Sequence, residues 1–135
     1  MESFEPFNWQ HTEWSALISD YIGKMEPRPK WLYLNAHFWP HDFPLKAPAV
    51  AEAAANSNLK TIWSTATVSN NFKAQKRLGT IDQEMCDFTD FCLNNTWMET
   101  DLKSSDMFDF FHFKPHVYKI MNQRLLDVIR RQRQF

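Results

Sequence analysis

The residues best suited to chemistry in this chain are its histidines. Four of the five lie in two related pentapeptides, HFWPH at 37–41 and HFKPH at 112–116. Two histidines four residues apart on a helix share one face, and two such pairs could complete a tetrahedral zinc site. The prolines at 40 and 115 disfavour the α conformation one residue earlier, so neither pentapeptide is expected to be a continuous helical turn. We therefore predict no metal and no cofactor, and keep a zinc-binding domain as an alternative.

A catalytic interpretation rests on Asp109, His112 and Asn35. Asp109 lies three residues before His112, in DFFH. A general base needs an imidazole held in one tautomer, and a carboxylate near Nδ1 can hold it. Asn35 lies near the end of the apolar run WLYLNA, and its side-chain amide can donate to a developing oxyanion. Because loops at the carboxyl ends of parallel strands carry the chemistry of α/β sheets, we expect these groups at one edge of the sheet.

The elements that must position these residues alternate between helix and strand. Apolar periodicity and alanine content predict helices at about 12–24, at 47–57 with Pro48 in the first turn, at 81–94 behind a capping box of Thr80 and Gln83, and from Pro115 onward. Short bulky runs predict strands at 31–36, 59–68 and 97–102. This order predicts an α/β fold, a small three-stranded parallel sheet flanked by helices, in one domain spanning 1–135. The acids at 82, 84, 87 and 90 are expected to form a solvated helix face.

Composition limits the class of partner. Fifteen basic and sixteen acidic residues give a net charge of −1, so we expect no nucleic acid. No apolar run reaches the length of a membrane span and the first residues do not resemble a signal peptide, so we expect no span and leave the compartment open.

Cys86 and Cys92 would lie about 9 Å apart along the predicted helix, too far to bridge, and are expected to be free thiols. NNT at 94–96 is a glycosylation sequon.

Three blocks of the sequence resemble a known family. WLYLNAHFW, LKTIWSTAT and DMFDFFHFKPHVYKIMNQRLLD resemble the later conserved blocks of the SGNH (GDSL-type) hydrolases, most of all the branch called PC-esterase. The resemblance covers about 31–127. It implies that Asn35 is the oxyanion donor, Asp109 the triad acid and His112 the base. It also implies the C-terminal part of a flavodoxin-like three-layer fold.

The chain departs from the family at the nucleophile. The family places a serine in a Gly-Asp-Ser block after its first strand, and the only glycines here, Gly23 and Gly79, precede no serine. The resemblance therefore covers only the C-terminal part of such an enzyme, and the domain is expected to be incomplete on its N-terminal side. The strand at 31–36 would then have an open edge, which invites self-association. A fragment, a pseudoenzyme with a shortened sheet and one half of an assembly all remain open.

The expected activity is ester hydrolysis or acyl transfer on an ester- or acyl-bearing small molecule or glycan. Whether this chain is itself an enzyme stays open because the nucleophile is missing. We expect His37, Trp39 and Phe111 to bind the substrate. The alternative is a non-catalytic binding or interaction module on the same scaffold.

Overall fold

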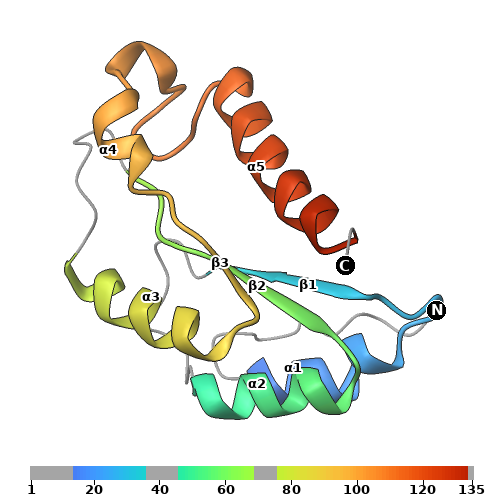
Figure 1. Ribbon diagram of the computed structural model, residues 1–135. Helices are drawn as coiled ribbons and strands as arrows, with labels where there is room; N and C mark the ends of the chain where they lie inside the picture. The colour runs from blue at the N-terminus through green and yellow to red at the C-terminus, as the bar shows by residue number, and fades with distance from the viewer. Residues whose placement is uncertain (1–13, 36–45, 69–75, 134–135) are drawn as a thin grey trace, which may run out of the picture.

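Three parallel strands form the centre of the computed structural model, which describes residues 14–35, 46–68 and 76–133 (Figure 1). The strands are β1 (Trp31–Leu34), β2 (Lys60–Ser64) and β3 (Phe91–Leu93), paired in the order β1-β2-β3. Four of the five residues of the central strand β2 are buried. The predicted α/β fold with a small three-stranded parallel sheet is therefore confirmed.

Helices lie on both sides of this sheet. They are α1 (Trp14–Asp20), η1 (Ile22–Lys24), α2 (Ala47–Asn56), α3 (Lys76–Phe88), α4 (Trp97–Asp101), η3 (Ser104–Asp106) and α5 (Pro115–Arg133). Parallel strands are connected by right-handed crossovers, so the order β1-β2-β3 places α2 and α3 on the same face. Figure 1 shows α1, α2 and α3 on one side and α5 on the other. No helix in the described ranges is both long enough and apolar enough to cross a membrane.

The buried side chains form two clusters. The larger lies between the sheet and the helices α1, α2 and α3, and includes Leu32, Trp63 and Met85. The partners Leu34 and Trp63 stand side by side in the register of β1 and β2, so both project toward these helices. The second cluster joins α4, the following loop and the start of α5. Its buried members are Val68, Met98, Leu102, Met107, Phe113 and Val117.

The third strand is not where the sequence predicted it. Residues 97–101 form α4 and not a strand, because Met98 and Leu102 are buried at helical spacing. The strand is β3, inside the segment predicted to be helical. α3 ends at Phe88, and the Asp90 carboxylate then accepts the backbone N–H of Thr61 at 2.8 Å, which anchors the chain beside β2.

The prediction of free thiols is wrong because α3 ends before Cys92. Cys86 lies on α3 and Cys92 on β3, and the reversal between them brings their Cα atoms to 5.2 Å and forms a disulfide. The predicted capping box is also wrong, because α3 begins at Lys76 and Thr80 is already inside it.

Asp82 and Asp90 do not belong to a solvated helix face as predicted. The Asp82 carboxylate accepts Trp63 Nε1–H at 2.8 Å and the backbone N–H of Ala66 at 2.9 Å. Asp90 lies beyond α3 and is held by both the backbone and the hydroxyl of Thr61. These two acids connect α3 and the turn after it to the central strand.

Candidate functional site

Asp109 and His112 lie on a short loop between η3 and α5. The loop is closed by an antiparallel bridge between Met107 and Phe113, both buried. Within it, Phe108 N–H donates to the carbonyl of His112 at 2.8 Å. The buried ends hold the loop against the second core, while its tip faces solvent.

The two side chains contact each other directly. His112 Nδ1 lies 2.9 Å from Asp109 Oδ1 and 2.8 Å from Oδ2. If Nδ1 carries the proton, it donates to the carboxylate and Nε2 is left as the proton acceptor. The side chains of His112 and Asp109 are 68% and 49% exposed, so a reactant could reach the imidazole from solvent. We call this pair the Asp109–His112 dyad.

Backbone groups keep the dyad carboxylate ionised. Asp109 Oδ1 accepts the N–H groups of Phe111 at 2.9 Å and His112 at 2.7 Å. These two bonds, the first being the larger cause, lower the pKa of Asp109 below its usual range, and the His112 side chain lowers it further. A charged Asp109 both orients the imidazole and would stabilise it when protonated.

His116 pairs with a different carboxylate. Its Nε2 lies 2.7 Å from Asp106 Oδ1, and the backbone N–H of Lys103 donates to Asp106 Oδ2 at 2.8 Å. These bonds, with Lys103 first, lower the pKa of Asp106. This second pair ties η3 to the first turn of α5. Across the described residues, no group of three or more His, Cys, Asp or Glu side chains could hold a metal.

Two of the other predicted site residues, Asn35 and Phe111, lie within the described ranges. Asn35 follows β1 directly and is exposed, and within the described ranges no hydrogen bond joins it to Asp109 or His112. His37 and Trp39 lie outside the described residues. Phe111 is next to the dyad in sequence, and its ring packs edge-on against Phe110 with centroids 4.7 Å apart.

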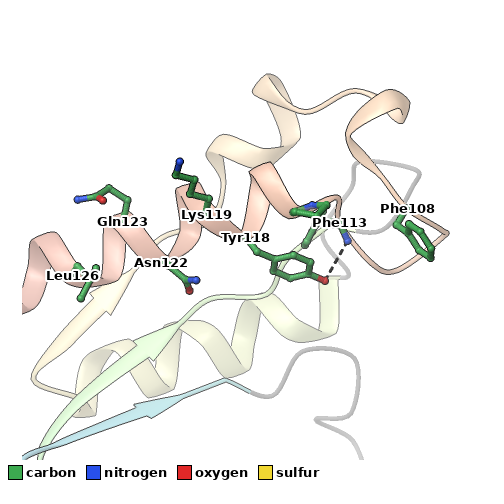
Figure 2. A pocket seen from close by; sticks show the side chains of 8 residues that line it. Phe108, Phe113, Tyr118, Lys119, Asn122, Gln123 and Leu126 are labelled. Carbon is green, nitrogen blue, oxygen red and sulfur yellow. Dashed lines mark hydrogen bonds between the residues drawn. The ribbon is translucent and has the colours of Figure 1, made fainter.

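An apolar hollow adjoins the dyad loop. We call it the α5 groove; its volume is about 660 Å³. Figure 2 shows its lining, with Tyr118 and Asn122 projecting from α5 on the side opposite Lys119. Tyr118 Oη accepts the backbone N–H of Phe113 at 3.2 Å, which joins the groove to the dyad loop. The lining residues are Phe108, Phe113, Pro115, Tyr118, Lys119, Asn122, Gln123 and Leu126.

The spacing of residues on α5 indicates the α5 groove. Tyr118, Asn122 and Leu126 recur every four residues, which places them on one face of a helix. Tyr118 and Leu126 are 38% and 44% exposed, so this face of α5 is not covered by the core.

Ser64, at the carboxyl end of β2, has a structural role. Ser64 is buried, and its Oγ accepts Asn95 Nδ2–H at 2.8 Å. Asn95 also donates to the Thr65 carbonyl at 2.7 Å. In the part of the chain that the structure describes, no serine hydroxyl bonds to His112.

No protein-family model, curated protein or solved structure matches this chain.

Proposed function

We propose that the chain is an SGNH-hydrolase-like domain in which the Asp109–His112 dyad is the acid–base part of an acyl-transfer site. The observation that carries the proposal is the contact of His112 Nδ1 with both oxygens of a carboxylate held by two backbone N–H groups. This arrangement selects one tautomer and leaves Nε2 as the base.

The order of elements supports this assignment. The dyad comes after the last strand and just before the last helix, where the resemblance expects the Asp-x-x-His motif. Asn35 comes at the carboxyl end of β1, the position expected for the oxyanion donor.

The reaction is acyl transfer to a hydroxyl. His112 Nε2 takes the hydroxyl proton as the oxygen attacks the acyl carbon, and Asp109 stabilises the resulting imidazolium. The amide of Asn35 donates to the oxyanion. The proton then passes from Nε2 to the leaving alcohol as the ester bond breaks. The hydroxyl is not supplied by this chain and comes from a partner chain or from the substrate.

The α5 groove supports the proposed substrate class. Aromatic and aliphatic side chains line it beside Phe108 of the dyad loop, while Asn122 and Gln123 add hydrogen-bonding groups. Such a lining suits an acyl chain attached to a polar body. We propose an ester- or acyl-bearing small molecule or glycan.

The test compares aryl acetate hydrolysis by the purified chain and three variants. Without a serine, the dyad can still act as a general base toward a water molecule, and general-base catalysis contributes about 10²–10⁴-fold. His112→Ala and Asp109→Asn should therefore lower a slow rate of hydrolysis by about 10²-fold or more. His116→Ala is the matched control, since its carboxylate partner is a different one, and should leave the rate unchanged.

A fluorophosphonate probe completes the experiment. We expect no labelled serine in the purified chain. An unchanged rate in His112→Ala contradicts the catalytic proposal, and a labelled serine contradicts the absence of a nucleophile.

A second candidate function is a non-catalytic binding module. The observation that favours it is the α5 groove itself, which needs no serine to bind an acyl group. If the chain is a binding module, an acylated glycan should shift the NMR signals of Tyr118 and Asn122 equally in wild type and in His112→Ala. Neither protein should then hydrolyse esters.

A further inference from the structure

We propose that Asn94 is an acceptor for an N-linked glycan. Asn94, Asn95 and Thr96 form the sequon, and the first and third of them are exposed at the carboxyl end of β3. This inference is independent of the acyl-transfer proposal, because it involves neither the dyad nor the α5 groove.

The turn presents the acceptor amide to solvent. Asn94 Oδ1 accepts the backbone N–H of Thr96 at 2.9 Å, so the side chain folds back over the sequon and its Nδ2 is turned away. Thr96 precedes α4, yet its hydroxyl makes no capping bond to that helix. The hydroxyl that sequon recognition requires is therefore not used in capping the helix.

The residues around the turn hold it in place. Asn95 is buried and donates to Ser64 Oγ and the Thr65 carbonyl at 2.8 and 2.7 Å. Arg124 Nη2 donates to the Asn94 carbonyl at 3.3 Å. The two adjacent asparagines thus have different roles. The side chain of Asn95 holds the turn against the carboxyl end of β2, and the side chain of Asn94 faces solvent.

The disulfide supplies the second observation. Cys92 precedes Asn94 by two residues and is bonded to Cys86. Disulfides persist in oxidising compartments, which include the secretory route where N-glycans are added. The chain therefore has both an exposed acceptor, Asn94, and a disulfide typical of the oxidising compartment in which N-glycans are added.

The modification needs a lipid-pyrophosphate-linked oligosaccharide as donor. Nδ2 of Asn94 attacks C1 of the reducing-end sugar and loses one proton. A C–N bond forms, the bond from C1 to the pyrophosphate oxygen breaks, and the lipid pyrophosphate leaves.

The test uses the full chain secreted from cultured eukaryotic cells behind a cleavable leader. Intact mass before and after peptide-N-glycosidase, with peptide mapping for conversion of Asn94 to aspartate, measures occupancy. We expect a glycan on Asn94 in wild type and in Thr96→Ser, and none in Asn94→Gln or Thr96→Ala. The Thr96→Ser and Thr96→Ala pair differs by one hydroxyl, so misfolding would not separate them.

Two results would overturn the inference. One is a secreted chain with the Cys86–Cys92 bond formed and Asn94 bare. The other is a secreted chain in which both cysteines stay reduced, since the oxidising compartment is then no longer supported.

Discussion

The exposed Asp109 carboxylate is held by several hydrogen bonds. Its Oδ1 accepts two backbone N–H groups, and both of its oxygens lie within 2.9 Å of His112 Nδ1. The backbone bonds fix the carboxylate, and the carboxylate fixes the ring. The dyad therefore depends on the fold of its loop as much as on its two side chains.

Because of these hydrogen bonds, the contribution of Asp109 to stability depends on pH. Its pKa is lowered, so the carboxylate stabilises the loop above the usual Asp value of about 3.9 and loses this effect as the pH falls through the lowered pKa. We predict a ¹³C NMR titration midpoint for the Asp109 carboxyl carbon below that of an ordinary aspartate. His112→Ala should keep most of the shift, because the backbone bonds are its larger causes. A midpoint in the ordinary range would show that the loop is not closed as described.

At the scale of elements, Asp82 links α3 to β2. Trp63 is almost fully buried, and Asp82 is the acceptor of its Nε1–H. Asp82→Ala should lower the free energy of unfolding by about 1–3 kcal/mol, the cost of leaving a buried donor without a partner. Urea unfolding followed by tryptophan fluorescence measures this. Asp87→Ala, an exposed acid on the same helix that accepts a bond from Gln83, is the matched control and should change little.

Burial gives Asp82 a pH dependence of the opposite sign to that of Asp109. Desolvation raises the pKa of Asp82, against the two hydrogen bonds that lower it. The folded state therefore holds the proton more tightly than the unfolded state, and this group's stabilisation declines as the pH rises through the raised pKa. Asp82→Asn should lose less stability than Asp82→Ala, since its amide oxygen can still accept from Trp63.

The sequence predicted the elements whose patterns were long or clear. The helix from Pro115, the helix containing Pro48 and the strands starting near Trp31 and Lys60 are where periodicity and composition placed them. The third strand was missed because Phe91–Leu93 is too short for alternation to register, and Met98 and Leu102 suit a helix as well as a strand.

The candidate site was predicted only in its local part. Asp109 and His112 are three residues apart, and a turn brings such neighbours together without help from the rest of the fold. The disulfide and the α5 groove depend on where α3 ends and on which face of α5 is left uncovered. Those are tertiary outcomes that residue spacing did not determine.

At the scale of the whole molecule, β1 is an outer strand. In the described ranges it pairs only with β2, and Tyr33 on β1 is 40% exposed. Open strand edges pair with other chains unless they are covered or charged. Self-association through this edge therefore remains our proposal for a partner of this chain.

Light scattering after size exclusion tests the edge. We predict a mass that rises with concentration, and a dissociation constant about tenfold weaker in Tyr33→Lys, which corresponds to about 1.4 kcal/mol. Ile120→Lys on α5 changes an equally exposed apolar residue away from the edge and should have no effect. A monomeric mass at every concentration, or equal effects of the two variants, argues against pairing through β1.

Under the acyl-transfer proposal, His112 and Asn35 act on one reacting group. A double-mutant cycle on aryl acetate hydrolysis measures this most directly, with His112→Ala, Asn35→Ala and the double variant. Asn56→Ala, at the end of α2 and before β2, is the control. We predict that each single variant is slower than wild type, and that the double variant is slower than either single one but less slow than the product of the two losses. Groups that act on one reacting centre are coupled, while oxyanion stabilisation persists without the base. Effects that simply multiply, or an Asn35→Ala rate equal to wild type, would contradict a shared role of His112 and Asn35.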